Sequence, residues 1–152
     1  MAKTIWDPAR EREIRDRVAK LSPEAPRRWG KMTAPEMLCH LIDGFRVPLG
    51  DQEVLAERPG PFRLAPLRWL FVYTLPWPKG KIPTMREFRQ THPEEWAHDL
   101  AAWQALCDRF VANGRSASPS WKAHPGFGPL SNTEWGRLVY LHVDHHLRQF
   151  GG

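Results

Sequence analysis

Three stretches of this 152-residue chain begin with the same helix-start signal. At 33–36, 91–94 and 131–134 a Ser or Thr stands three residues before a Glu, and an amphipathic run follows each signal. In such a capping box the hydroxyl and the carboxylate accept hydrogen bonds from backbone N–H groups that the first helical turn leaves unpaired. Asp7 followed by Pro8 marks a fourth start, because Asp caps helices well and Pro suits the first helical position. Four amphipathic helices predict an all-α chain that folds as a four-helix bundle.

The chain between the second and third predicted helices is less regular. The run RLAPLRWLFVYTL at 63–75 is apolar nearly all round, which predicts an extra short helix buried in the core. Several Pro and Gly residues follow at 76–83, and a second Pro/Gly-rich stretch, ASPSWKAHPGFGPL, occupies 117–130. Neither stretch has low complexity, so we expect ordered loops that fold over the bundle.

Length and composition predict a single domain spanning residues 1–152. A chain of this size buries enough apolar surface to fold without disulfides. Cys39 and Cys107 lie in separate apolar segments with no C-x-x-C spacing, so we expect free buried thiols. The N-terminus lacks the apolar stretch of a secretion signal, and the longest apolar run is too short to span a bilayer. We therefore expect a cytoplasmic protein that does not enter membranes.

The formal net charge is +5, but the basic residues are not clustered. In AREREIRDRVAK, residues 9–20, nearly every basic residue stands near an acidic one, which is typical of a solvated helix with ion pairs. The eight tryptophans are scattered along the chain, and they predict filling of the core and of a pocket wall. Nucleic acid is therefore not an expected partner.

The last predicted helix carries two histidines at a spacing that suits a metal ion. His142 and His146 lie four residues apart, so their side chains point the same way, about 5–6 Å apart at Cβ. Helical phase places both on the apolar stripe of that helix, and it places His40 on the inward stripe of the second helix. Three imidazoles in an apolar bundle leave donors and acceptors unpaired, at about 1–3 kcal/mol each, unless they share a partner. We predict that these three histidines bind a divalent transition metal; the alternative is a hydrogen-bonded cluster in the core.

Two polar residues stand close to the predicted ligands in the sequence. Asp43, three residues after His40, can accept a hydrogen bond from the second ring nitrogen of that histidine. The alternative for Asp43 is an exposed carboxylate near Arg46. Gln149, seven residues after His142, can present its amide to a metal-bound group, or it is a buried amide with partners of its own.

The remaining histidines have weaker claims to a site. His145 stands one helical step, about 100°, from His146, so it faces the edge of the apolar stripe or a neighbouring helix. His92 lies in a helix-start signal, His98 has no second histidine at helical spacing, and His124 precedes a proline in a loop. We expect these last three at the surface.

Three segments carry a resemblance to a known family. They are WGKMTAPEMLCH at 29–40, KIPTMREF at 81–88 and HPGFGPLSNTEWGRLVYLHVDHHLRQFG at 124–151. In these segments the chain resembles the DinB/YfiT-like superfamily of metalloenzymes, and the resemblance spans nearly the whole chain. It implies an up-down-down-up four-helix bundle with a divalent metal, often zinc or nickel, near one end. It also implies that the three metal ligands are His40, His142 and His146.

The resemblance further implies a class of reaction. Characterised members of the superfamily include thiol transferases and a thiol-dependent isomerase, which use low-molecular-weight thiols such as bacillithiol or mycothiol. A metal with three histidine ligands and an open position lowers the pKa of a bound thiol or water, which generates a nucleophile at neutral pH. We therefore expect a transferase, isomerase or hydrolase that acts on a small molecule as a monomer or homodimer. The alternative is a non-catalytic bundle, with or without metal, that serves as a binding or scaffold protein.

Overall fold

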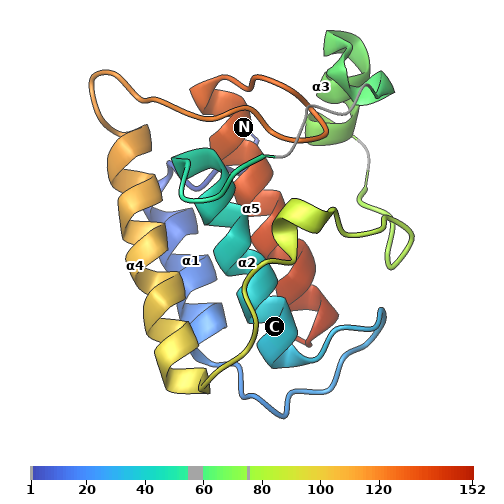
Figure 1. Cartoon of the computed structure of the whole chain (residues 1–152), viewed down its shortest axis with the longest axis vertical. Helices are drawn as coiled ribbons and strands as arrows, with labels where there is room; N and C mark the ends of the chain where they lie inside the picture. Colours follow the sequence, from blue (N-terminus) through green and yellow to red (C-terminus); the bar gives the residue numbers. More distant parts are fainter. Residues whose placement is uncertain (1, 55–59, 75) are drawn as a thin grey trace.

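The computed structural model describes residues 2–54, 60–74 and 76–152, and every regular element in that part of the chain is helical (Figure 1). Its α-helices are α1 Pro8–Ala19, α2 Ala34–Leu49, α3 Ala65–Tyr73, α4 Trp96–Gly114 and α5 Asn132–Gln149. Short 3-10 turns occupy Pro61–Arg63 and Arg86–Phe88. The described residues contain no strand, only an isolated bridge between His124 and Gly128. The all-α prediction is confirmed.

The four longer helices lie side by side. Figure 1 shows that α1 and α5 run in one direction and that α2 and α4 run in the other. The most extensive contact joins α2 to α4, and α1 packs against α5. Because α2 also contacts α5, it lies between α4 and α5 and brings its apolar face to both. The core between these helices contains Met37, Leu41, Trp103, Phe110, Trp135 and Leu147, all of them buried.

Three of the four predicted helix starts form as expected. The Asp7 carboxylate accepts from the Ala9 N–H, and capping boxes form at Thr33 and at Ser131. The box predicted at 91–94 is wrong, because α4 begins at Trp96 and no side chain caps its first turn.

The reason is that Thr91 has another partner. Its hydroxyl and its backbone N–H both donate to the buried carboxylate of Asp43 on α2. A hydrogen bond to a buried carboxylate is about twice as strong as one between neutral groups, so it prevails over a local cap at the surface.

The extra helix predicted at 63–75 forms as α3, but its predicted burial is wrong. Residue 75 lies outside the described residues. Only Val72 is fully buried, whereas the side chains of Leu64 and Trp69 are 62% and 55% exposed. An all-round apolar pattern predicts a helix without predicting what covers it. Among the helices and turns, α3 packs mainly against α5 and the turn at Pro61–Arg63, and Phe71 also contacts Trp77 and Phe127 in the loops. No helix in the described ranges has both the length and the apolar character needed to cross a bilayer.

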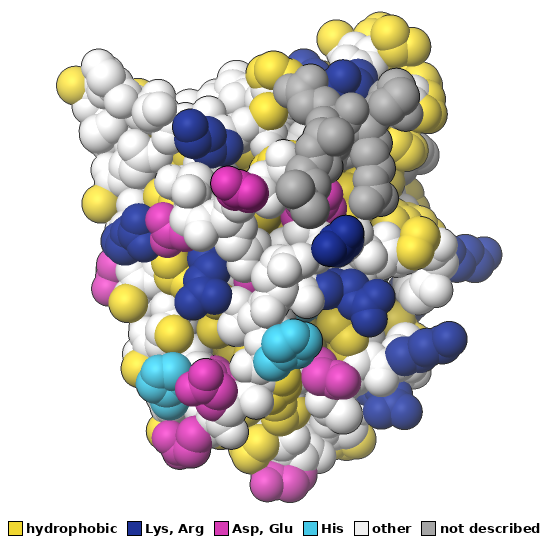
Figure 2. All heavy atoms as spheres, viewed as in Figure 1, with side chains coloured by type: hydrophobic (Ala, Val, Ile, Leu, Met, Phe, Trp, Pro, Cys, Tyr) yellow, Lys and Arg dark blue, Asp and Glu magenta, His cyan; other side chains and the backbone are white. Residues whose placement is uncertain are grey.

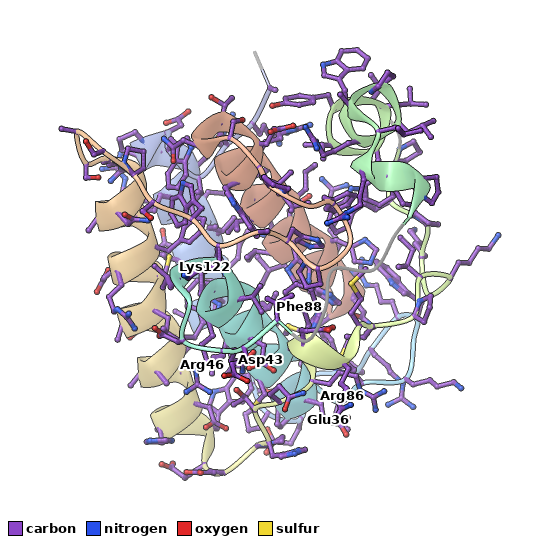
Figure 3. The ribbon with its side chains drawn as sticks, turned by 45° about the horizontal axis from the view of Figure 1, so that its top comes forward. Glu36, Asp43, Arg46, Arg86, Phe88 and Lys122 are labelled. Atoms are coloured by element: carbon purple, nitrogen blue, oxygen red, sulfur yellow. The ribbon has the colours of Figure 1, made fainter. Side chains whose placement is uncertain are left out.

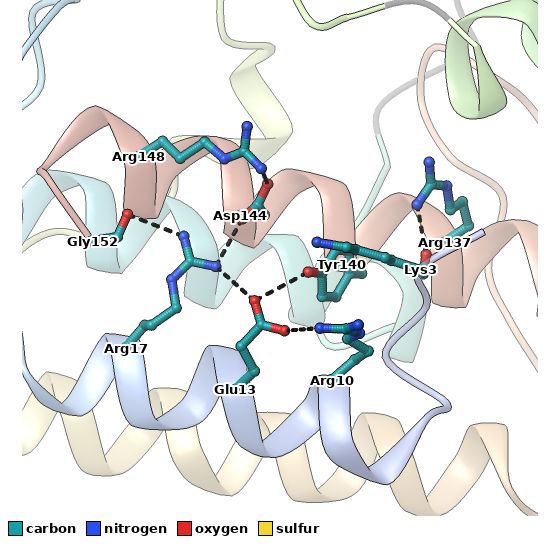
Figure 4. A network of polar contacts seen from close by, with 9 residues as sticks. All are labelled: Lys3, Arg10, Glu13, Arg17, Arg137, Tyr140, Asp144, Arg148 and Gly152. Carbon is teal, nitrogen blue, oxygen red and sulfur yellow. Dashed lines mark hydrogen bonds and ion pairs between the residues drawn. The ribbon is translucent and has the colours of Figure 1, made fainter. Parts of the chain in front are cut away.

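A polar network joins α1 to α5 on the side away from α2 (Figure 4). Arg17 donates to Asp144 at 2.8 Å and to Glu13 at 3.3 Å, and the Tyr140 hydroxyl donates to Glu13 at 3.4 Å. Arg148 completes the network with a 2.9 Å ion pair to Asp144. These contacts fix the rotation of α5, so that its opposite face turns toward α2.

Trp6 packs against the ends of α4 and α5 near the start of the chain, and two glycines allow this contact. Its indole N–H donates to the Asn132 carbonyl at 2.9 Å, and its ring lies directly on Gly114 of α4 and Gly136 of α5. A Cβ atom at either glycine would overlap the indole ring, which is too rigid to yield locally.

We predict that Gly136→Ala lowers the free energy of unfolding by about 1–3 kcal/mol, because the added methyl group displaces Trp6. Urea unfolding followed by circular dichroism measures the loss. Gly60→Ala is the matched control, since a Cβ atom there meets nothing within 4 Å. Equal stabilities of the two variants would show that Trp6 does not depend on the glycine.

Candidate metal centre

The histidines His40, His142 and His146 meet between α2 and α5. Each offers one ring nitrogen, and these nitrogens all lie within 4.8 Å of one another. The ring centroids are 4.6 to 5.0 Å apart. His40 and His146 are buried and His142 is partly buried. This group can hold a metal ion.

The tautomer of His40 follows from its backbone partner. Its Nδ1 lies 2.9 Å from the carbonyl oxygen of Phe88, in the 3-10 turn that packs on α2. A carbonyl oxygen only accepts, so Nδ1 carries the proton and donates. The lone pair of His40 is therefore on Nε2, which points into the cluster toward His142.

The tautomer of His146 follows from a relay through Gln149. The amide nitrogen of Gln149 donates to the Trp29 carbonyl at 2.8 Å, which leaves the amide oxygen to face His146 Nδ1 at 2.7 Å. Nδ1 therefore carries the proton and Nε2 carries the lone pair. Gln149 is thus a buried amide with partners of its own, the second of the two sequence alternatives, and one of these partners is a cluster histidine.

Two glycines allow the close approaches around these rings. Gly30 has a left-handed φ of +79°, and a Cβ atom there would lie 2.5 Å from the Gln149 amide nitrogen. Gly44 lies one helical turn after His40, and a Cβ atom there would lie 3.3 Å from His142 Nδ1. Side chains at these positions would push Gln149 and His142 away from their partners.

His142 completes the cluster from α5. Its Nε2 lies 2.7 Å from His40 Nε2. Because the His40 nitrogen carries a lone pair, His142 is the donor in this contact. For His142 Nε2 to serve as a metal ligand, the proton on that nitrogen would have to move to Nδ1, because a protonated ring nitrogen has no free lone pair.

All three rings are held in the neutral form. Burial lowers the pKa of His146 to about 3, lowers that of His40, and lowers that of His142 well below its usual range. In His142 and His146 the neighbouring histidines lower the pKa further. Neutral imidazole is the form that binds metals, so the cluster is ready to bind at neutral pH.

Asp43 takes neither of the roles that the sequence suggests. It is fully buried, and it does not bond to His40. Its carboxylate accepts from Gln52 Nε2 at 2.6 Å and from the backbone N–H groups of Gln90 and Thr91 at 2.7 and 3.0 Å. Figure 3 shows Asp43 on the side of α2 that faces the chain near Phe88. Asp43 therefore holds the segment whose Phe88 carbonyl orients His40.

Of the other histidines, His92 and His98 are exposed, as predicted. His124 is buried, so its predicted surface position is wrong. Its Nδ1 accepts from the backbone N–H groups of Gly126 and Phe127 at 3.0 and 3.1 Å. The tight turn that follows Pro125 folds this ring inward, which the residue pattern alone does not reveal.

His145 is half-buried at the edge of the apolar face of α5. Its ring packs against Trp29 and Trp77, with centroid distances of 5.8 Å to each. It thus faces two loops rather than a neighbouring helix, and it stands outside the group of three histidines that could hold a metal ion.

A cavity of about 650 Å³ opens over the cluster. His40, His142 and His146 line it together with side chains from α3 and from the loops. The apolar wall includes Trp29, Phe71, Trp77, Met85, Phe88 and Phe127. Sequence reasoning did not identify these wall residues individually, although several lie in the three segments that carry the family resemblance.

Comparisons of the chain with protein-family models, with curated proteins and with solved structures gave no match.

We predict that Asp43→Asn weakens metal binding about 10- to 100-fold, because loosening the segment after Phe88 frees the His40 ring. In the Asn variant an amide nitrogen replaces one of the two carboxylate oxygens. In either orientation this nitrogen faces at least one N–H donor, from which it cannot accept a hydrogen bond. Competition with a chromogenic chelator measures the affinity. Asp51→Asn, which removes only a surface ion pair to Arg109, is the control and should bind like wild type. Unchanged affinity in Asp43→Asn would show that His40 needs no such support.

Burial lowers the pKa of His124 to about 3 in the folded protein, against about 6.5 in an unfolded chain. The unfolded state therefore binds a proton first, and stability falls as the pH drops below about 6.5.

We predict that His124→Asn reduces the acid sensitivity of the metal-free protein, because an Asn oxygen can accept the same N–H bonds without titrating. The wild-type loss of stability between pH 7 and pH 5 should exceed that of the variant by about 2 kcal/mol. Urea unfolding at both pH values measures the difference. His92→Asn, at an exposed position, should retain the wild-type pH dependence; the same pH dependence in all three proteins would contradict the assignment.

Proposed function

We propose that this protein is a divalent-metal enzyme of the DinB/YfiT-like superfamily, folded as an up-down-down-up four-helix bundle. One observation carries the proposal: three neutral imidazoles converge from α2 and α5. Two of them, His40 and His146, have their second nitrogens bound to fixed acceptors. Metal-binding histidines are held in this way, because the second hydrogen bond sets both the tautomer and the ring orientation.

The donor set suits zinc or nickel. Imidazole nitrogen is a good ligand for both metals and a poor one for magnesium or calcium. Among the described residues, no Cys, Asp, Glu or fourth His joins the group. Structural zinc sites are usually closed by four protein ligands, whereas three ligands leave a position for a reacting group. The ligand count therefore supports a catalytic role for His40, His142 and His146.

We propose a transferase or isomerase reaction with a low-molecular-weight thiol, or a hydrolysis if water takes the open position. When bound, the metal would lower the pKa of the thiol or water and supply a nucleophile at neutral pH. The chain itself would fix the ligand rings through Phe88 and Gln149 and surround the reacting atoms with aromatic side chains. The cavity of about 650 Å³ matches a small-molecule substrate. We further propose a cytoplasmic monomer or homodimer.

A second candidate is a metal-free or non-catalytic bundle. The observation in its favour is the 2.7 Å hydrogen bond between His40 and His142, which pairs two rings without an ion. With the bonds to Phe88 and Gln149, it leaves few polar atoms of the cluster unsatisfied. Metal uptake separates the two candidates.

We predict that the wild-type protein binds about one divalent transition metal per chain and that Ala at position 40, 142 or 146 abolishes uptake. The matched control is His145→Ala, because His145 differs from His146 by one helical step and stands outside the group. Elemental analysis after metal loading and desalting gives the stoichiometry.

Thermal unfolding supplies a second measurement. Metal at a hundredfold excess over Kd adds about 2.7 kcal/mol, so wild type and His145→Ala should melt several degrees higher with metal. His142→Ala and His146→Ala should show almost no shift. Uptake well below half an equivalent in wild type, or equal shifts in all four proteins, would contradict the site.

Turnover tests the enzymatic part of the proposal. The metal-loaded protein is incubated with electrophiles and with several low-molecular-weight thiols, and the loss of free thiol is followed. Activity that depends on metal and disappears in His146→Ala supports an enzyme. Full metal loading without turnover over a broad panel of thiols and electrophiles would favour the non-catalytic bundle.

A further inference from the structure

The charged side chains that line the cavity are all basic. They are Lys31, Lys81 and Arg89, and the described lining residues include no Asp or Glu. All three are exposed, and within the described part of the chain none of them forms an ion pair. Elsewhere on the protein, basic residues such as Arg15, Arg17 and Arg109 are paired with carboxylates. The rim of the cavity is therefore basic and has no ion pair among the described residues, although Arg89 lies near enough to the Glu36 carboxylate to lower the pKa of that group.

These basic residues come from three separate segments. Lys31 follows the loop that bonds to Gln149, Lys81 lies in the loop after α3, and Arg89 follows the turn that bonds to His40. Figure 2 shows Lys and Arg side chains gathered on the side where Figure 1 places these loops. Convergence of three segments on one cavity, each with a basic side chain that forms no ion pair with any described residue, favours a binding role over a general surface charge.

The wall between rim and cluster is aromatic. Trp77 contacts Phe71 at 5.3 Å and His142 at 6.1 Å between ring centroids. Phe71 in turn contacts Phe127 at 5.6 Å, and Trp29 contacts His145 at 5.8 Å. Side chains of this kind bind the flat or apolar body of a ligand. The floor, formed by neutral histidines, carries no charge of its own.

We propose that the cavity binds an anionic small molecule with an apolar or aromatic body. The anionic group would lie at Lys31, Lys81 and Arg89, the body on Trp29 and the other aromatic rings, and the far end over the histidine cluster. This inference rests on the proposed function only where it concerns a reaction of the ligand's far end at the histidine cluster. Binding of the anion depends on the rim and the wall, so it can be tested without metal.

The test compares cinnamate with cinnamamide on the metal-free protein. The two probes share a flat aromatic body and differ in one negative charge. Titration calorimetry at low ionic strength should give about tenfold tighter binding of cinnamate, equivalent to about 1.4 kcal/mol, and the preference should shrink as salt is added.

Variants locate the preference. Lys81→Gln and Arg89→Gln should each lower the ratio of the two affinities about two- to fivefold, as expected for exposed charges. The matched controls are Arg12→Gln on α1 and Lys20→Gln directly after it, both at exposed positions that do not line the cavity. They should leave the ratio unchanged.

Three results would overturn the inference. They are equal affinity for the two probes, no binding of either at millimolar concentration, and an equal effect of the control variants. Tighter binding of a short oligonucleotide than of cinnamate, with the same variants affected, would instead identify the rim as a nucleic-acid surface and would also overturn it.

The two proposals fail in different ways. A protein that takes up no metal and still prefers cinnamate refutes the proposed metal enzyme while the anion site stands. A protein that loads one metal and shows no preference for cinnamate refutes the anion site alone.

Discussion

The contact between α2 and α5 places three imidazoles in an apolar interior, and every one of them must stay uncharged there. A neutral imidazole has one donor and one acceptor, so each buried ring requires a partner for both nitrogens or leaves one for a metal. Gly44 permits this contact, because a Cβ atom at this position would lie only 3.3 Å from His142 Nδ1. The rest of the site is arranged around this requirement.

The partners of His40 and Gln149 come from segments outside the α-helices. The Phe88 carbonyl accepts a hydrogen bond from His40, and the Trp29 carbonyl accepts one from the Gln149 amide nitrogen. The amide oxygen of Gln149 is thereby oriented to accept from His146. Asp43 anchors the first loop by accepting from two of its backbone N–H groups. The loops therefore determine which nitrogen of each ring carries its proton, and hence which nitrogen is available to a metal ion.

The same loops build the cavity. These loops lie over the histidine cluster, which forms the floor of the cavity. They add the aromatic side chains of its wall and the basic side chains of its rim. The floor is suited to a metal by its neutral nitrogens, and the rim is suited to an anion by its basic side chains. A ligand that extends from rim to floor would contact groups from both ends of the chain and from its middle.

Sequence by itself was enough for the presence of the helices and for the inward phase of the three histidines, but not for the contact between α2 and α5 that brings these histidines together. Capping boxes at Thr33 and Ser131 and the phase of His142 and His146 are local properties, since they depend on residues within a few positions of each other. Tertiary structure alone decided three features. They are the burial of His124, the hydrogen bonds that Asp43 accepts from the chain after Phe88, and the exposed face of α3. Each of these features depends on a segment that is distant in the sequence and packs against the residue. The hydrophobic pattern describes only a residue and its neighbours along the chain, so it does not identify that distant segment.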